Sequence, residues 1–321
     1  MVFNGEFVRR RRGTSPPNAS TQSLVDTVKS VEKKIESTLL LAWDDLDEWR
    51  RDNAFIVSGY RPTSNSYQGS FSSIFALHNE SVNIWTHLAG SIFFTTVGAA
   101  AFYFYEKLVA PRYMSAVWTD ILVFGCFFAG AFLCLGMSAT FHTLCNHSPE
   151  VAKWGNKLDY TGIVCLIIGS YMPALYYGFY CLPELMEIYL STIWILGLAC
   201  LTVSWFERFR TPAWRPYRAL MFVCLGVSGV VPVVHGITIY GYQELNERMG
   251  LSWVVFQGFL YILGAFIYAI RWPERLFPKT FDIWGSSHQI FHVLILLAAA
   301  AHLYGMVKAF DFHHGALGSR C

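Results

Sequence analysis

The chain has 321 residues, of which 54% are hydrophobic and only 14% are charged. Soluble domains carry roughly 25% charged residues, so this composition excludes an ordinary soluble globular protein and is typical of a membrane protein. The formal net charge is only +2, and we expect no nucleic-acid partner.

The N-terminal quarter of the chain is the most polar part. Residues 1–21 are rich in Arg, Ser, Pro and Asn, which predicts a disordered cytosolic tail. Residues 22–83 are expected to form a cytosolic amphipathic helix and a linker. From about Ser23 to Arg51, apolar residues recur near helical spacing, and "VSGYRPTSNSYQGS" then has the composition of a linker.

Seven apolar windows follow, each without Asp, Glu, Lys or Arg and each near the 20 or so residues that cross a bilayer as a helix. They predict an all-α, seven-transmembrane helix bundle over residues 84–307, with 308–321 as an extracellular tail. The windows are Trp85–Tyr105, Ile121–His142, Tyr160–Leu182, Ile188–Phe206, Ala219–Tyr240, Leu251–Ile270 and Ile283–Val307.

The distribution of Lys and Arg predicts the orientation of the bundle. Nineteen of the 24 basic residues lie on the side of the N-terminal segment. Without that long segment, the connections still divide 9 against 5 in the same sense. Because basic residues favour the cytosolic side, the amino terminus is predicted to be cytosolic and the carboxyl terminus extracellular. This orientation is the reverse of that of G-protein-coupled receptors.

Ionisable side chains within spans are costly, and each marks a candidate functional site. The second window ends at His142, the third begins just after Asp159, and the seventh carries His288 and His292 in its first turns. In the predicted topology all four lie at the cytosolic end of the bundle. His288 and His292 are four residues apart, so they share one helix face.

Two imidazoles from one helix and one from another predict a zinc site. Three histidines leave the fourth position of a tetrahedral zinc for water, which is typical of an open catalytic site. Asp159 is placed to hydrogen-bond that water or to accept its proton. Ser138 lies one turn before His142, where its hydroxyl is expected to support the site or to contact a substrate carbonyl.

A His-x-x-x-His motif alone is a weak signal, because polar residues in membrane bundles often satisfy one another. We expect such structural roles for the other polar side chains: Glu80 and His87 capping the first span or holding a neighbouring helix, and His235 and His302 making hydrogen bonds in the outer half. His313 and His314 are expected to lie in a solvated outer tail.

Five segments resemble one known family. "HNESVNIWTHLAG", "SATFHT", "KLDYTG", "GSYMPALYYGFYC" and "GSSHQIFHVLILLAAAAHLYG" occur in the order of the progestin and adipoQ receptor family. The resemblance is to its adiponectin-receptor-like branch, which includes fungal zinc-homeostasis proteins and is related to the haemolysin III proteins. It covers roughly Tyr60 to Val307.

The resemblance implies zinc bound by His142, His288 and His292, with Asp159 beside the zinc-bound water and Ser138 in the motif before the first ligand. It also implies hydrolysis of a lipid amide, ceramide, to a sphingoid base and a fatty acid, and a receptor role for an extracellular protein ligand. The family suggests the plasma membrane, with endomembranes as the alternative.

Two other interpretations remain open at this point. The protein could be a non-catalytic signalling receptor in which zinc is structural and holds the second and seventh spans together. A haem protein with paired imidazoles across helices is the third interpretation.

Overall fold

The structure is a computed structural model that describes residues 27, 39–210 and 212–315. The chain divides into two units, residues 1–39 and 40–321, and every element discussed below belongs to the second. The expected disordered tail over 1–21 and most of the expected amphipathic helix lie outside the described residues, as do residues 316–321.

The described residues form an all-α structure with seven helical segments long and apolar enough to cross a membrane. Large apolar side chains such as Phe93, Leu122 and Phe259 are exposed on the outside of the bundle, as expected where lipid replaces water. The spans are formed by α3 (Ser81–Phe104), α4 (Trp118–Leu144), α5 (Pro149–Gly178), α6 (Pro183–Trp205), α7 with α8 (Arg215–Val227 and Val230–Met249), α9 (Leu251–Ile270) and α10 (Ser287–His314).

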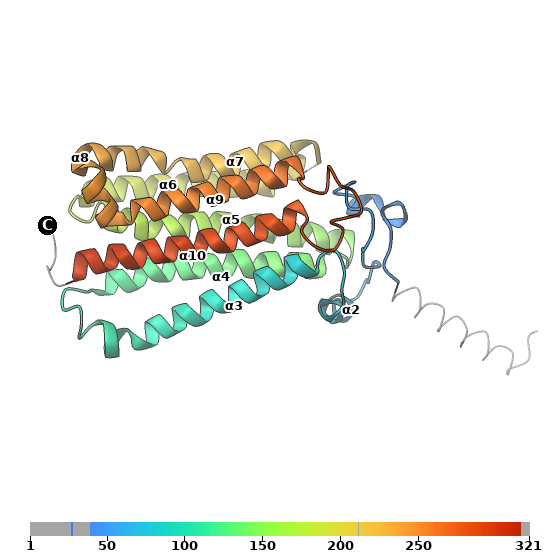
Figure 1. Ribbon diagram of the computed structural model, residues 1–321, viewed down its shortest axis with the longest axis horizontal. Helices are drawn as coiled ribbons and strands as arrows, with labels where there is room; N and C mark the ends of the chain where they lie inside the picture. The colour runs from blue at the N-terminus through green and yellow to red at the C-terminus, as the bar shows by residue number, and fades with distance from the viewer. Residues whose placement is uncertain (1–26, 28–38, 211, 316–321) are drawn as a thin grey trace, which may run out of the picture. The chain divides into compact units, whose positions relative to one another are not determined.

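Helices α3, α4 and α10 lie side by side, with α9 on the other flank of α10 and α5 packed along α4 (Figure 1). The first turns of α3, α5 and α10 and the last turn of α4 therefore meet at one end of the bundle. We call this the histidine end, because His142, His288 and His292 lie there. The segment before α3 is also at this end (Figure 1).

Glycines set the register between α4 and α5. A Cβ added at Gly162 would lie 2.7 Å from Cys134 Cα, and one at Gly130 would lie 2.6 Å from the carbonyl oxygen of Cys165. Small residues at such positions allow transmembrane helices to pack with their backbones in contact. Because Asp159 is three residues before Gly162 and Ser138 is four after Cys134, this contact brings Asp159 and Ser138 to the same level.

The segment before α3 differs from the expected helix that runs to Arg51. Leu41 instead pairs with Tyr60 in an isolated antiparallel bridge, and the residues up to Arg51 form the 3-10 turns η1 (Trp43–Asp45) and η2 (Glu48–Arg50) rather than one helix. The reason is tertiary: Leu46, Ile56 and Tyr60 form a small core of their own. The expected linker contains the short helix α2 (Tyr67–Ser72) and the 3-10 turn η3 (Ser73–Phe75).

The fifth span consists of two helices rather than the single expected window. The break falls at Ser228 and Gly229, just before Pro232, which lies in the first turn of α8. Proline is tolerated in a first turn because the amide it lacks would have no helical partner there. At this break the hydroxyl of Tyr171 donates to the carbonyl oxygen of Gly226 at 2.6 Å.

Helix α10 runs to His314, past the expected boundary at Val307. His313 and His314 are buried, so the expectation that both are solvated is wrong. Nε2 of His314 lies 3.1 Å from the Asp120 carboxylate, and Nε2 of His313 lies 3.0 Å from the carbonyl oxygen of Tyr177. These polar partners on α4 and α5 let the last turns of α10 stay packed against the bundle.

Candidate metal centre

Three imidazoles converge at the histidine end. His142 near the end of α4 and His288 and His292 in the first turns of α10 each offer a ring nitrogen, and these atoms lie within 4.8 Å of one another. The ring centroids of His142 are 4.9 Å from those of both partners. His142 and His292 are buried and His288 is half-buried. This group could hold a metal ion.

The orientation of His142 is fixed by the carboxylate of Glu80, the residue directly before α3. Its Nδ1 lies 2.7 Å from Oε2 of Glu80, and because an ionised carboxylate only accepts, Nδ1 carries the proton. Nε2 then has a free lone pair, and this buried atom has no hydrogen-bond partner among the described residues. A carboxylate behind a ligating histidine is the usual means of orienting it.

Glu80 itself is held in the ionised form. Burial alone would raise the pKa of its carboxyl group. The attraction of His142, with hydrogen bonds from His142 and from the side-chain amide of Asn83 at 2.6 Å, outweighs burial and holds the pKa well below the usual range. Glu80 therefore presents a charged acceptor to His142 at neutral pH.

His292 is oriented by the backbone of the same helix, α3. Its Nδ1 lies 3.2 Å from the carbonyl oxygen of Asn83. A carbonyl oxygen accepts but cannot donate, so Nδ1 carries the proton and Nε2 is left with its lone pair. The ring of His87 stacks on His292 with centroids 3.5 Å apart and planes at 3°.

His288, the third member of the group, packs edge-on against the ring of Tyr268, with centroids 5.0 Å apart. The donor set fits a zinc-type ion, which binds neutral imidazole nitrogens. In two of the three rings, Nδ1 donates to an acceptor on another helix or beside it. Nε2 of His142 has no hydrogen-bond partner in the described chain.

The two other predicted site residues lie beside this group. The Ser138 hydroxyl is within hydrogen-bonding reach of the Asp159 carboxylate, and Asp159 is close enough to interact electrostatically with His142. Ser138 is buried and Asp159 is half-buried. The structure thus brings together all five residues singled out from the sequence, and it places the carboxylate of Asp159 on α5, across from α10.

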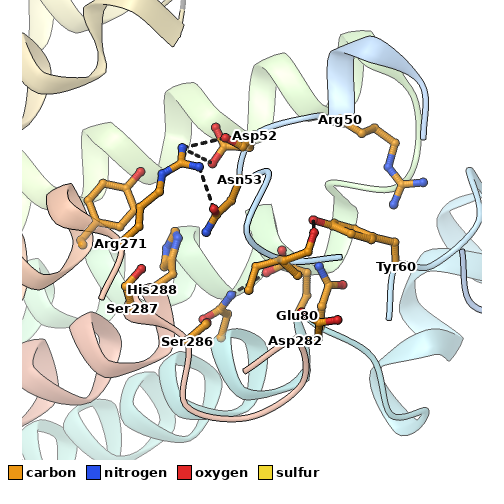
Figure 2. A pocket seen from close by; sticks show the side chains of 14 residues that line it. Arg50, Asp52, Asn53, Tyr60, Glu80, Arg271, Asp282, Ser286, Ser287 and His288 are labelled. Atoms are coloured by element: carbon orange, nitrogen blue, oxygen red, sulfur yellow. Dashed lines mark hydrogen bonds and ion pairs between the residues drawn. The ribbon is translucent and has the colours of Figure 1, made fainter. Parts of the chain in front are cut away.

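A small cavity opens on the group from the segment before α3 and the α9–α10 connection (Figure 2). We call it the vestibule. It has a volume of about 90 Å³, and it is lined by Arg50, Asp52, Asn53, Ile56, Tyr60, Asn79, Glu80, Asn83, Tyr268, Arg271, Asp282, Ser286, Ser287 and His288.

A chain of hydrogen bonds ties the wall of the vestibule to the first turn of α10. Arg271 donates to the side-chain oxygen of Asn53 at 2.7 Å (Figure 2), and the amide nitrogen of Asn53 donates to Glu274 at 3.1 Å. The second oxygen of Glu274 accepts from the backbone nitrogen of Ser287 at 2.8 Å. Since Ser287 precedes His288, this chain fixes the start of the helix that carries two of the three histidines.

Of the other expectations for polar residues, some are confirmed and one is wrong. Glu80 makes no capping bond to α3 within the described chain; it holds the neighbouring helix α4 through His142. His235 hydrogen-bonds the Tyr189 hydroxyl at 2.7 Å, as expected. The same expectation for His302 is wrong, because both of its ring nitrogens are buried without a partner among the described residues. Its ring lies against Phe127.

The histidine group belongs to a region shared with known proteins. Residues 75–303 match the family described as haemolysin-III related. The chain is 42% identical to the ADIPOR-like receptor IZH2 of Saccharomyces cerevisiae over 275 residues, which is 86% of this chain and 85% of that protein.

Animal relatives are equally similar. The chain is 46% identical to the adiponectin receptor protein of Drosophila melanogaster over 82% of its own length. It is 43% identical to the progestin and adipoQ receptor-like protein 1 of Caenorhabditis elegans over 83%. The match covers only 58% and 60% of these two proteins. With the family match over most of its length, this chain belongs to the haemolysin-III-related family of seven-helix membrane proteins, among its adiponectin-receptor-like members.

Proposed function

We propose that this protein is a zinc-dependent hydrolase of lipid amides, with zinc held by His142, His288 and His292. The observation that carries the proposal is the meeting of three oriented imidazoles with a carboxylate, Asp159, inside the end of a transmembrane bundle. When bound, zinc would supply Lewis-acid chemistry to an amide carbonyl and make a water molecule more acidic. The substrate class is ceramide or a related lipid amide.

Asp159 would move the proton in this reaction. Hydrolysis of an amide takes up one water, whose proton must reach the leaving nitrogen as the carbon–nitrogen bond breaks. A carboxylate beside the reacting atoms can accept that proton and return it to the amine. Ser138 would hold the carboxylate of Asp159 in place, since its hydroxyl is within hydrogen-bonding reach.

The position of the site suits a membrane lipid. The three histidines lie near the ends of two spans, where the polar centre of a lipid meets the interface while its chains remain among apolar side chains. We propose that the histidine end faces the cytosol. The excess of Lys and Arg on this side supports that orientation. At the opposite end Cys181 is disulfide-bonded, which is expected on an oxidising side of the membrane. The plasma membrane, or an endomembrane, would be the location.

A second candidate function is a signalling receptor for an extracellular protein ligand, with structural zinc and a role in lipid and zinc homeostasis. The yeast and fly relatives are named receptors, which favours it. In this account zinc joins α4 to α10 and stabilises the bundle without turnover.

Lipid release by purified protein distinguishes the two functions. We expect the zinc-loaded protein to release fatty acid from ceramide, measured by mass spectrometry. Asp159→Asn should retain zinc and lose about 100-fold or more of the rate, the usual contribution of a general base. Asp311→Asn, at the opposite end of the bundle, is the matched control and should keep the rate. Full activity of Asp159→Asn, or no release of fatty acid by the wild type, would refute the hydrolase function and favour the receptor function.

A further inference from the structure

The segment formed by α2 and η3 exposes its apolar side chains although it lies outside the seven spans. It runs on to Leu77, shortly before the start of α3. Four large apolar side chains in it are each at least half exposed: Tyr67, Phe71, Phe75 and Leu77. For Phe75 the exposed fraction is 85%. We call these four side chains the wedge.

The polar side of the same segment faces the protein. Ser70 is buried, and its hydroxyl donates to the side-chain oxygen of Asn146, between α4 and α5, at 2.9 Å. The hydroxyl of Ser73 accepts from Arg61 at 2.7 Å. A surface helix of a soluble protein has the opposite arrangement, with its apolar side buried and its polar side in water. The reversed arrangement indicates that the medium outside the wedge is apolar.

The wedge continues the lipid-facing surface of α3. The ring of Phe75 packs edge-on against that of Trp85, with centroids 6.3 Å apart, and the indole nitrogen of Trp85 donates to the carbonyl oxygen of Ile74 at 3.1 Å. Trp85, Ile92 and Phe93 are all exposed and lie on one side of α3. Since tryptophan at the end of a span marks the membrane interface, the wedge lies at the interface of the histidine end (Figure 1).

The composition of the segment favours apolar insertion over electrostatic attachment. Residues 62–106 contain no Lys or Arg, so basic side chains that attract anionic lipids are missing from this part of the chain. The apolar face of an interfacial helix is buried about 5 to 10 Å into the boundary between headgroups and acyl chains. We therefore expect the contact to form with zwitterionic lipids as well as with anionic lipids.

Hydrogen bonds join this segment to the metal centre. The buried ring of His78 donates from Nε2 to the carbonyl oxygen of Ser73 at 3.1 Å, and its Nδ1 accepts from the backbone nitrogen of Glu80 at 3.1 Å. The carboxylate of Glu80 in turn orients His142. Arg61 makes a second connection, because it donates both to Ser73 and to the carbonyl oxygen of His142. The position of η3 therefore affects the position of Glu80.

We propose that the wedge is a lipid-binding surface whose side chains insert into the leaflet at the histidine end, and that this contact, through His78, holds Glu80 in place behind His142. The occupant of the surface is the bilayer itself, at the level of the boundary between headgroups and acyl chains. The inference does not depend on hydrolysis, because the metal centre has the same geometry in a receptor with structural zinc.

Photochemical crosslinking identifies what covers the wedge. The full chain, with p-benzoylphenylalanine in place of Phe75, is reconstituted in phosphatidylcholine vesicles and illuminated. We expect an adduct of the protein with one phospholipid, detected by mass spectrometry. The same probe in place of Glu48, an exposed acidic residue of η2, is the control and should give little adduct. A crosslinked dimer, a crosslink to another protein in native membranes, or no more lipid adduct than from position 48 would overturn the proposal.

Zinc affinity in the same vesicles tests the connection to the metal centre. The double variant Phe71→Ser, Phe75→Ser should bind zinc about three- to tenfold more weakly, a smaller loss than removal of the supporting carboxylate itself causes. Phe71→Leu with Phe75→Leu retains an apolar surface and should retain the wild-type affinity. Met114→Ser, which changes a fully exposed apolar side chain at the opposite end of the bundle, should also leave the affinity unchanged.

Each result decides one part of the proposal. Wild-type affinity in the serine variant, or an equal loss in the leucine variant, would end the connection to Glu80. Wild-type protein that binds no zinc would end the metal centre and with it that connection, while the crosslinking would still decide the lipid contact. Fatty acid release plays no part in either measurement, so failure of the hydrolase proposal leaves this inference standing.

Discussion

Glu80 controls the metal affinity of the histidine group through a single hydrogen bond. Its carboxylate lies 2.7 Å from Nδ1 of His142, within the range of charge-assisted bonds. In Glu80→Gln the side chain keeps its size but loses its charge, so His142 becomes less basic and less firmly oriented. Loss of such a supporting carboxylate weakens metal affinity about 10- to 100-fold, equivalent to about 1.4 to 2.8 kcal/mol.

Competition between the protein and a chromophoric zinc chelator at neutral pH measures this affinity. Glu244→Gln is the matched control: Glu244 pairs with Arg248 at the opposite end of the bundle and is half exposed, so its substitution should leave zinc affinity unchanged. Circular dichroism checks that both variants keep their helices. An affinity of Glu80→Gln within about twofold of the wild type, or an equal loss in the control, would refute the orienting role.

Three further substitutions test the packing around the site. His302→Leu should leave the zinc content unchanged. The free energy of unfolding should increase, or fall by less than about 1 kcal/mol, because an apolar side chain replaces a buried imidazole without a partner. Loss of zinc would show that His302 is a ligand. Gly162→Val should destabilise the bundle by about 1 to 3 kcal/mol, since its Cβ would meet Cys134; an unchanged melting temperature would contradict the close α4–α5 contact. Arg61→Ala should cost about 3 kcal/mol, as the carbonyl oxygens of His142 and Thr143 lose a buried charged donor; thermal unfolding that matches the wild type would argue against it.

The sequence allowed the three histidines to be found because their placement depends on helix geometry alone. His288 and His292 share a face through their spacing of four residues, and the topology brings the end of the second span to the start of the seventh. Asp159 and Ser138 could be placed at the same end on the same grounds. The structure confirms the seven spans and brings these five residues together.

The groups that orient the histidines could not be predicted in the same way. Glu80 and Asn83 act through the approach of α3 to α4 and α10, which no periodicity in α3 encodes. An acidic residue directly before a span is the available signal; it predicts either a helix cap or a contact with a neighbouring helix, and it does not identify His142 as the partner. The Asn53–Glu274 contact joins residues 221 positions apart. The segment just before Asn53 has the apolar spacing of a helix, but Leu41 in that segment pairs with Tyr60 because of tertiary packing.

X-ray absorption at the zinc edge of the purified, zinc-loaded protein tests the central claim most directly. The account predicts about one zinc per chain with imidazole nitrogen at about 2.0 to 2.1 Å and one further light-atom ligand. Substitution of His142, His288 or His292 by Ala should remove one imidazole from the spectrum or abolish binding. A sulfur shell at about 2.3 Å, or protein that retains no zinc, would contradict the account.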